Sequence, residues 1–263
     1  MSFDGKRVLV TGSSRGIGLA TARAFLTRGV RVAVNGRTDD SVAKAIEDLA
    51  GGDAVIAVPG DLASVETCET VVGRTLEAFG GLDVLVNNAG VYAIATIEET
   101  DEAAWDAIID TSLKAAFFCS RAALPALQES QGSIVNIASS AGLMGFPQIA
   151  AYCAAKAGLV NMTRSMALEL APEVRVNCVC PGPVDTDMGR INLDPELPPE
   201  AARVAFEQGL PVQRMGTVEE IAEAVVWLAA EAGGFVTGSV FAIDGGRTAG
   251  GQKRRSAAAE NDA

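Results

Sequence analysis

The feature that most constrains how this chain can fold is a glycine-rich turn near its amino terminus, Val8–Gly18, with the sequence VLVTGSSRGIG. The apolar run Val8–Val10 predicts a buried parallel strand, and apolar residues at helical spacing from Ile17 onward predict a helix directly after the turn. The first backbone N–H groups of such a helix are free to bind an anion, and glycines let the chain approach that anion closely. The turn therefore predicts a site for a dinucleotide pyrophosphate.

The rest of the chain alternates short apolar strands with helices. This pattern predicts one α/β domain, a Rossmann-type doubly wound parallel sheet of about seven strands with helices on both faces. After Val8–Val10, the expected strands are Val30–Val34, Ala54–Val58, Leu82–Val86, Ser133–Ala138, Val174–Val179 and Ser239–Ala242. The expected helices are Ile17–Arg28, Asp39–Leu49, Ser64–Phe79, Asp101–Leu127, Ala150–Ala171 and Val218–Ala230. Residues 1–249 form this domain, and residues 250–263, which offer no apolar face to bury, are expected to be a disordered tail.

The composition narrows the possible functions. A net charge of −12, with no apolar run long enough to span a bilayer, predicts a cytoplasmic protein that binds neither nucleic acid nor a membrane. The chain has no histidine, which excludes Ser–His–Asp hydrolysis and argues against a metal site. We expect the five scattered cysteines to be reduced thiols. Acid–base chemistry near neutral pH must therefore use a perturbed Tyr, Lys, Asp, Glu or Cys side chain.

Tyr152 and Lys156 have the spacing Tyr-x-x-x-Lys within a predicted helix, which puts both side chains on one helix face. A lysine ammonium beside a tyrosine favours the phenolate, and so moves the tyrosine pKa from about 10 toward the operating pH. Ser139 stands just past the predicted strand Ser133–Ala138, whose carboxyl end opens onto the crevice where such sheets bind ligands. At that place Ser139 can hydrogen-bond the oxygen of a substrate carbonyl group, which is the atom that Tyr152 would protonate.

The Ser–Tyr–Lys order, together with Thr11–Gly18, Asn87–Gly90 and Pro181–Thr186, resembles the short-chain dehydrogenase/reductase family over about residues 5–248. Within the family, the chain resembles the 3-oxoacyl-carrier-protein reductase branch. The resemblance implies hydride transfer between a nicotinamide cofactor and a ketone or secondary alcohol, with Tyr152 as proton donor or acceptor. It implies that Lys156 lowers the pKa of Tyr152 and holds the nicotinamide ribose. It also implies a homotetramer, or a homodimer.

The same resemblance implies which residues bind the cofactor. They are Gly12, Ser14, Arg15, Gly16, Ile17, Gly18, Arg37, Asp61, Leu62, Asn88, Ala89, Gly90, Tyr152, Lys156, Pro181, Gly182, Val184 and Thr186. Asp61 would meet the adenine ring beside Leu62, although capping the following helix is an equally open role for this aspartate. Val184 would bind the carboxamide through its backbone, and Thr186 the carboxamide or a phosphate.

The end of the second strand bears on the choice between NADP(H) and NAD(H). An acidic residue there binds the ribose 2′-hydroxyl of NAD, whereas an arginine meets the 2′-phosphate of NADP. This chain has Gly36 where NAD-preferring members of the family have an acid, followed by Arg37. Arg15 can approach the same phosphate from the glycine turn. NADP(H) is therefore favoured, while Asp39 and Asp40 keep NAD(H) open.

Ser112 marks a departure from the family pattern. Many members have an asparagine at this position, which anchors a water that links the catalytic lysine to solvent. Serine has a hydroxyl but a shorter reach and no amide. We therefore expect a slower proton relay, with hydride transfer itself intact.

The substrate pocket is expected to be lined by Ala93, Ile94, Ala141, Met144, Gln148 and Met188, with the proline-rich segment 185–213 as a lid. Such a lining predicts a moderately apolar ketone. The main interpretation is an NADP(H)-dependent carbonyl reductase or alcohol dehydrogenase acting on a small molecule. Two alternatives remain: an NAD-dependent alcohol, diol or sugar dehydrogenase, and a nucleotide-sensing protein of the same fold with little turnover.

Overall fold

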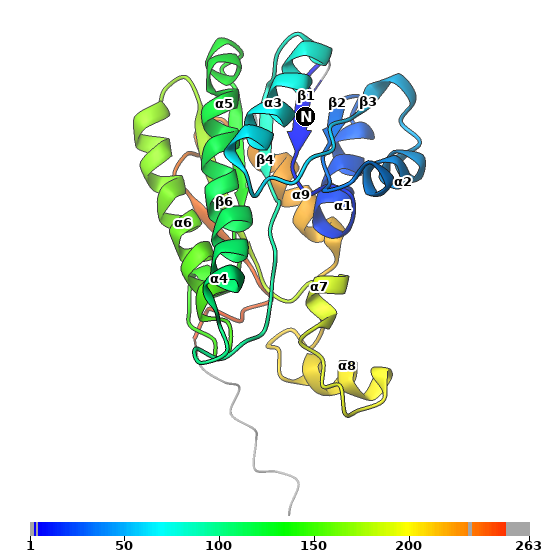
Figure 1. Cartoon of the computed structure of the whole chain (residues 1–263), viewed down its shortest axis with the longest axis vertical. Helices are drawn as coiled ribbons and strands as arrows, with labels where there is room; N and C mark the ends of the chain where they lie inside the picture. The colour runs from blue at the N-terminus through cyan, green and yellow to red at the C-terminus, as the bar shows by residue number, and fades with distance from the viewer. Residues whose placement is uncertain (1–2, 4, 231–232, 251–263) are drawn as a thin grey trace, which may run out of the picture.

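Seven parallel strands form one sheet in the order β3–β2–β1–β4–β5–β6–β7 in the computed structural model, which describes residues 3, 5–230 and 233–250 (Figure 1). The strands are β1 Arg7–Val10, β2 Arg31–Val34, β3 Val55–Ala57, β4 Val84–Asn87, β5 Ser133–Ile137, β6 Arg175–Pro181 and β7 Val240–Ile243. Their bounds lie within a few residues of those predicted. β2 and β3 lie on one side of β1, and β4 to β7 lie on the other, as in a doubly wound sheet.

Helices cover both faces of this sheet, which confirms the predicted fold class. One face is covered by α1 (Gly16–Leu26), α2 (Asp39–Leu49) and α9 (Val218–Ala229). The other face is covered by α3 (Val65–Phe79), α5 (Ala115–Glu129) and α6 (Ala150–Leu170). The remaining helices are α4 (Glu102–Ile109), α7 (Asp187–Arg190) and α8 (Pro199–Gln208).

The alternation of side chains along β1 shows why the strands are apolar throughout. Val8 and Val10 join the cluster that packs under α1 and α9, whereas Leu9 joins the cluster under α3 and α5. All three are completely buried, and burial of each such side chain stabilises the fold by about 1.5–3 kcal/mol. A strand buried on both sides has no polar face, as the run Val8–Val10 predicts.

The helix expected over Asp101–Leu127 is not uniform. It consists of α4, a π-helical turn over Asp110–Lys114 and α5, which runs on to Glu129. Ser112 lies within the widened turn and is buried. Apolar spacing does not reveal such a turn, because the apolar stripe continues across it.

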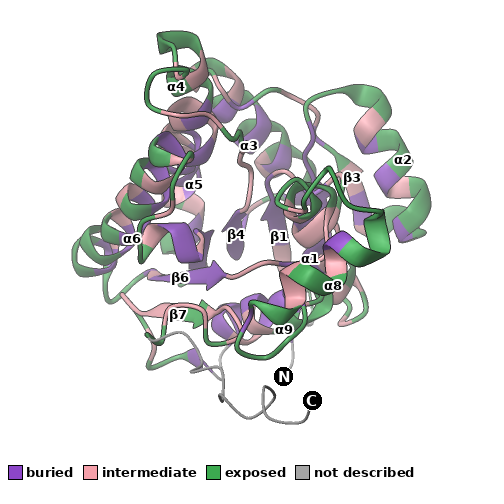
Figure 2. Cartoon of the chain, turned by 90° about the horizontal axis from the view of Figure 1, so that it is seen from below, coloured by how far each residue is buried: buried purple, intermediate pink, exposed green. Residues whose placement is uncertain are grey.

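The carboxyl ends of the strands meet at one edge of the sheet, at the lower end of the molecule in Figure 1. Figure 2 views the molecule from that end, with α8 in front of the sheet and largely exposed. Among the described residues, none of the helices has the length and hydropathy that crossing a bilayer requires. The tail predicted at 250–263 lies, apart from Gly250, outside the described residues.

Candidate active site

A cavity of about 1270 Å³ opens at the carboxyl edge of the sheet. The glycine turn after β1 forms one wall, and the loops after β4, β5 and β6 form the others. Ligand pockets commonly span about 300–1,000 Å³, so this volume is sufficient for a dinucleotide together with a small substrate. Its position outside the strand ends is the one where parallel sheets bind ligands.

Glycine is required at two positions of the turn that joins β1 to α1. Gly12 has a φ of +60°, and a Cβ atom on it would lie 2.8 Å from Ala89 Cα. A Cβ on Gly18 would collide with the Gly12 carbonyl oxygen and with the Asn88 amide. α1 begins at Gly16 without a side-chain cap and without an acidic residue in its first turn. Its first N–H groups and the positive end of its dipole are therefore open to an anion.

Asn88 ties the loop after β4 to this glycine turn. Its Nδ2 donates to Thr11 O and to Gly12 O, each at 2.9 Å. The Thr11 hydroxyl in turn accepts from Asn88 N and Ala89 N, both at 3.0 Å. The two loops that would face a pyrophosphate are thus fixed to each other, and Gly90 continues the second loop along the cavity wall.

The far end of the cavity lies at the end of β2. The buried Asn35 side chain accepts from Gly12 N at 3.1 Å and donates to Val58 O at 2.9 Å, which fixes the chain just before Gly36. The cavity is lined here by Ser14, Arg15, Gly36, Arg37, Thr38, Lys44, Asp61 and Leu62. Lys44 belongs to none of the sequence motifs. Asp39 and Asp40 lie in the first turn of α2 and are not part of the cavity lining.

Asp61 does not have the capping role that the sequence left open. The cap of α3 is Ser64, whose hydroxyl accepts from Thr67 N at 3.1 Å. The Asp61 carboxylate instead accepts from Ala63 N at 3.1 Å, and Asp61 lines the cavity beside Leu62. This leaves its carboxylate at the end of the cavity where β2 and β3 finish.

Ser139, Tyr152 and Lys156 come together on the cavity wall. Tyr152 and Lys156 lie one turn apart on α6, with Lys156 Nζ 5.6 Å from the centre of the Tyr152 ring. Lys156 Nζ also donates to Ile137 O at 2.8 Å. Ser139 follows β5 in an extended conformation, and its hydroxyl accepts from Ala141 N at 3.1 Å. The ends of β5 and the first turns of α6 thus bring a hydroxyl, a phenol and an amine to one place.

Burial shifts the acid–base properties of Tyr152 and Lys156 in opposite directions. It raises the pKa of Tyr152 to about 12, because the phenolate is desolvated, and the neighbouring Ser139 hydroxyl only partly opposes the rise. It lowers the pKa of Lys156 to about 8, because the ammonium is desolvated as well. Burial therefore dominates the pKa of both groups in the ligand-free protein, and the expectation that Lys156 lowers the pKa of Tyr152 stays a prediction.

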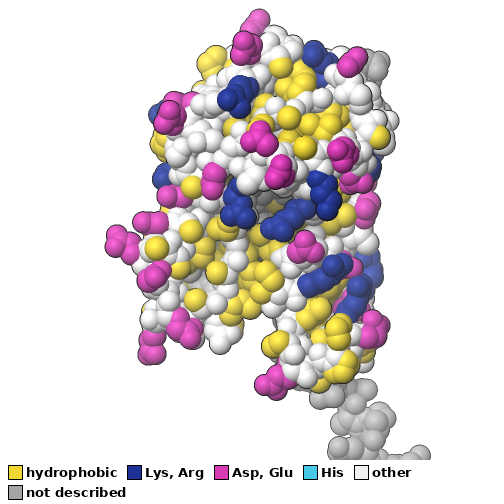
Figure 3. Space-filling model, turned by 45° about the vertical axis from the view of Figure 1, so that its right-hand side comes forward, with side chains coloured by type: hydrophobic (Ala, Val, Ile, Leu, Met, Phe, Trp, Pro, Cys, Tyr) yellow, Lys and Arg dark blue, Asp and Glu magenta, His cyan; other side chains and the backbone are white. Residues whose placement is uncertain are grey.

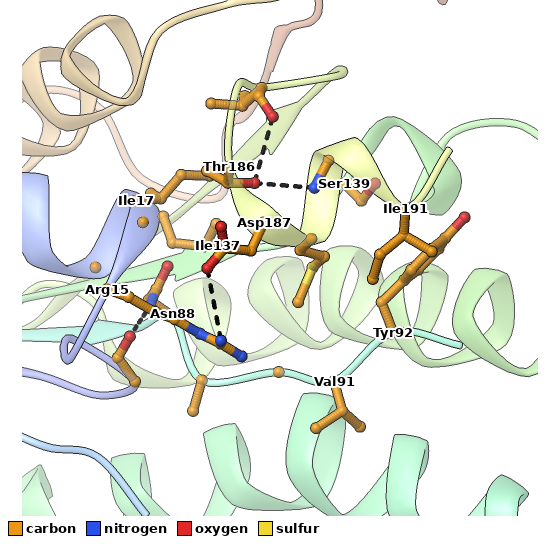
Figure 4. Close-up of a pocket in the computed structure, with 18 of the residues that line it drawn as sticks. Arg15, Ile17, Asn88, Val91, Tyr92, Ile137, Ser139, Thr186, Asp187 and Ile191 are labelled. Carbon is orange, nitrogen blue, oxygen red and sulfur yellow. Dashed lines mark hydrogen bonds and ion pairs between the residues drawn. The ribbon is translucent and has the colours of Figure 1, made fainter. Parts of the chain in front are cut away.

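The segment after β6 supplies the wall nearest these three residues, through Pro181, Gly182, Val184 and Thr186. Gly182 packs so closely on the turn after β7 that a Cβ would lie 2.6 Å from Asp244 Cα. The Thr186 hydroxyl caps α7 by accepting from Gly189 N at 3.0 Å (Figure 4). In the same view, Arg15 approaches Asp187 of α7 at 3.7 Å, which links the glycine turn to the segment 185–213.

The predicted substrate residues divide into two groups. Those that line the cavity are Ile94, Ala141, Gln148 and Met188. Ala93 and Met144 do not line it, which corrects the prediction for these two residues. Both are exposed on the loops after β4 and β5, where spacing alone does not tell which side chains turn inward.

Tyr92 is a cavity residue that the sequence does not reveal. Its ring packs edge-on against Tyr152, with 5.0 Å between ring centres, and its hydroxyl donates to Asn192 Oδ1 at 2.6 Å. Figure 4 shows Tyr92 beside Ile191, on the side of the cavity away from Asn88. Tyr92 has no motif around it, because its role arises from the way the loop after β4 packs onto α6.

Ser112 lies behind the cavity wall and does not line it. It is 1% exposed, and its hydroxyl accepts from Val91 N at 3.2 Å. A Cβ on Gly90 would meet Ser112 Oγ at 3.2 Å and Lys156 Nζ at 3.4 Å, so both groups lie against the same glycine. This arrangement supports a path for proton transfer from Lys156 past Gly90 to Ser112.

The sheet, the glycine turn and the cavity define a dinucleotide-binding α/β protein, and comparisons with known proteins identify its family. A family described as enoyl-(acyl carrier protein) reductase matches residues 12–248. The chain is 41% identical to 2-(S)-hydroxypropyl-CoM dehydrogenase 3 of Xanthobacter autotrophicus, over 92% of this chain and 96% of that protein. It is 39% identical to the 3-oxoacyl-[acyl-carrier-protein] reductase of Synechocystis, over 90% of this chain and 95% of that protein.

A solved structure from Sinorhizobium meliloti, described as a short-chain alcohol dehydrogenase, superimposes with a TM-score of 0.86 at 36% identity. The match covers 94% of this chain and 98% of that one. The chain therefore belongs to the short-chain dehydrogenase/reductase family, and it is an oxidoreductase that uses a nicotinamide cofactor.

Proposed function

We propose that this protein is an NADP(H)-dependent carbonyl reductase or alcohol dehydrogenase. It transfers a hydride between the nicotinamide and a ketone or secondary alcohol, with Tyr152 as the proton donor or acceptor. The observation that carries the proposal is the meeting of Ser139, Tyr152 and Lys156 on the wall of a cavity that begins at an uncapped helix N-terminus. The cavity thus joins an anion-binding end to an acid–base end.

The described residues fit the cofactor. The glycines of the turn leave room where a Cβ would collide, and the first turn of α1, which lines the cavity, contains no acidic residue. When bound, the nicotinamide would supply the hydride chemistry that no side chain can provide. Lys156 would hold the nicotinamide ribose hydroxyls, and the backbone of Val184 the carboxamide.

Three basic side chains favour NADP(H) over NAD(H). Arg15, Arg37 and Lys44 line the end of the cavity near β2, and Gly36 stands where an acid would repel a phosphate. Figure 3 shows Lys and Arg side chains gathered around a hollow on this face of a protein whose net charge is −12. These cations support a ligand with an additional phosphate group.

Replacing Arg37 by Ala is expected to weaken NADPH binding about ten- to a hundredfold, since a charge-assisted hydrogen bond contributes roughly 1.5–3 kcal/mol. NADH lacks the 2′-phosphate and serves as the internal control, so its affinity should change little. Fluorescence titration of both cofactors measures the difference. Equal losses for NADPH and NADH would contradict the assignment of Arg37 to the phosphate.

The side chains of the site have separate tasks in carbonyl reduction. The Tyr152 hydroxyl donates its proton to the carbonyl oxygen as the hydride arrives at the carbon, and Ser139 donates a hydrogen bond to the same oxygen. A Lys156 ammonium next to the phenol stabilises the phenolate that is left after the proton transfer. In alcohol oxidation the same groups act in reverse, with Tyr152 as the base.

Oxidation rates of NADPH and NADH with a panel of ketones and 3-oxoacyl thioesters test the proposed function. We expect turnover with NADPH and at least one ketone. Faster turnover with NADH, or with NAD and diols or sugars, would favour an NAD-dependent dehydrogenase. Tight NADPH binding without turnover on any substrate would indicate a nucleotide sensor.

Replacing Ser112 by Asn is expected to raise turnover modestly and to leave cofactor affinity unchanged, because an amide would hold a relay water more firmly than the serine hydroxyl does. The solvent deuterium isotope effect on turnover should shrink in the variant. An absent solvent isotope effect in the wild type would show that the relay is not rate-limiting. Thermal unfolding is the control, since the larger amide must fit against Val91 and Gly90.

We further propose that the segment 185–213 acts as a lid. The Tyr92–Asn192 and Arg15–Asp187 contacts already link this segment to the cavity wall.

We also propose that the chain forms a homotetramer, or a homodimer. Trp105 and Phe117 are 43% and 45% exposed on α4 and α5, which supports burial in a subunit contact. A dilute, active monomer in light scattering would contradict the assembly.

A further inference from the structure

A single arginine side chain lies at the substrate end of the cavity, far in sequence from every motif discussed above. Arg247 belongs to the turn that follows β7, and it is half-buried and lines the cavity. Its guanidinium lies over the ring of Phe146, with Cζ 4.5 Å from the ring centre. Phe146 also lines the cavity, so the cation and the aromatic face form one surface in it.

The turn that carries Arg247 is held rigidly. The Asp244 carboxylate accepts from Gly246 N at 2.9 Å, from Thr248 N at 2.7 Å and from the Thr248 hydroxyl at 2.6 Å. The same turn packs on Gly182, whose missing side chain leaves the space that Asp244 fills. Arg247 is therefore placed by the backbone next to the segment that follows β6.

The charge of Arg247 is not neutralised within the part of the chain that the structure describes. No carboxylate there lies within 4 Å of its guanidinium. Asp244, the nearest acid in sequence, already uses its oxygens within the turn. Burial lowers the pKa of Arg247, with Asp244 and Tyr92 opposing the shift, but a guanidinium stays charged at neutral pH. A partly desolvated cation without a partner is costly, and an incoming anion would offset this cost.

Arg247 also lies close to the reacting groups. Its positive charge acts on the Tyr92 hydroxyl, where it opposes the rise that burial causes in the pKa of Tyr92. The Tyr92 ring in turn packs on Tyr152. Asp194 also lines the cavity, and its carboxylate accepts from Glu196 N at 2.9 Å. The cations that we assign to the cofactor phosphate, Arg15, Arg37 and Lys44, line the end near β2.

We propose that Arg247 and the Phe146 face form an anion subsite, and that the substrate is a ketone or secondary alcohol that carries a carboxylate or another oxyanion. The inference rests on the proposed function, and it names the substrate class for that same site. Arg247 holds the oxyanion, the Phe146 ring packs beside the guanidinium, and the carbonyl carbon of the same molecule lies at Tyr152. The moderately apolar lining at Ile94, Ala141 and Met188 then accommodates the carbon chain between the two ends.

The test compares keto acids with their methyl esters, which differ in charge and little in size. Acetoacetate and levulinate, each with its methyl ester, provide two spacings between the keto carbon and the carboxylate. We expect the wild type to favour the better-fitting acid over its ester about ten- to a hundredfold in kcat/KM, as one charge-assisted contact allows. Replacing Arg247 by Met, which keeps an unbranched side chain, should abolish this preference.

Replacing Arg74 by Met is the matched control, because Arg74 is an exposed arginine on α3 that does not line the cavity. It removes the same charge from the protein and should keep the preference for the acid. NADPH affinity in the Arg247 variant should stay at the wild-type value, which separates the anion subsite from the phosphate end. A wild type without preference for the acids, or a preference that survives in the Arg247 variant, would overturn the proposal.

A binding measurement separates this proposal from the proposed function. Levulinate is titrated calorimetrically into the protein saturated with NADP⁺, a complex in which reduction cannot occur. If levulinate binds to the wild type and not to the Arg247 variant, the result supports the anion subsite, even if no ketone is reduced in the activity assays. Equal binding to both proteins, or none to either, would contradict the subsite even if neutral ketones are reduced.

Discussion

Replacing Tyr152 by Phe is expected to lower turnover by about 10²–10⁴, the contribution that a positioned general acid makes to a proton-coupled step. The substitution removes only the hydroxyl, and the ring can still pack against Tyr92. NADPH binding should persist, because the cations and glycines that we propose to hold its phosphates lie at the other end of the cavity. Steady-state rates with the best ketone, together with cofactor titration, measure both effects.

Replacing Tyr92 by Phe is the matched control for this experiment. It removes a hydroxyl from the neighbouring ring and breaks only the hydrogen bond to Asn192. Its effect on turnover should be far smaller than that of the Tyr152 variant. Near-normal turnover in the Tyr152 variant would mean that the proton donor is another group.

Replacing Lys156 by Met is expected to change how stability depends on pH, and the total effect reaches about 3 kcal/mol. The folded wild type holds the pKa of Lys156 at about 8, whereas the unfolded chain has the ordinary value of 10.5. Between these two values the unfolded chain binds more protons, so the stability of the wild type rises with pH in this window. Below about pH 8 both states are protonated, and the wild type bears the full cost of burying the charge.

The methionine variant has no such titration. Its stability relative to the wild type should therefore be greatest at neutral pH and fall by about 1.4 kcal/mol for each pH unit above about 8. The loss of the hydrogen bond to Ile137 O adds a constant offset that does not depend on pH. Urea unfolding of both ligand-free proteins from about pH 7 to about pH 10 measures the difference between their free energies of unfolding. The other titrating groups are the same in both proteins, so their contributions cancel in this difference. A difference that is independent of pH would show that Lys156 is not desolvated as described.

The parts of the site that the sequence predicts well are those that depend on local geometry. Gly12 and Gly18 are predictable because the turn from β1 to α1 leaves no space for a Cβ atom at either position. A short stretch of sequence is enough to reveal this steric requirement. The positions of Ser139, Tyr152 and Lys156 follow from one strand end and one helix turn. The sheet follows from strands that are apolar on both faces.

The parts that the sequence does not predict depend on how distant segments pack. Tyr92, Lys44 and Arg247 line the cavity from three separate loops or helices, and none of them belongs to a motif. The pKa values of Tyr152 and Lys156 depend on burial by the whole fold, which the Tyr-x-x-x-Lys spacing does not reveal. The π-helical turn at Asp110–Lys114 likewise leaves the apolar pattern unchanged.

The link between Asn88 and Thr11 has a consequence for the order in which the protein assembles during synthesis. The two residues are 77 positions apart, and their hydrogen bonds cross from β4 to β1. As the chain leaves the ribosome, the glycine turn and α1 emerge first but lack the loop that fixes their backbone carbonyls. Nucleotide capture by a nascent chain should therefore begin only after β4 has emerged and paired with β1, which makes cofactor binding a reporter of that long-range pairing.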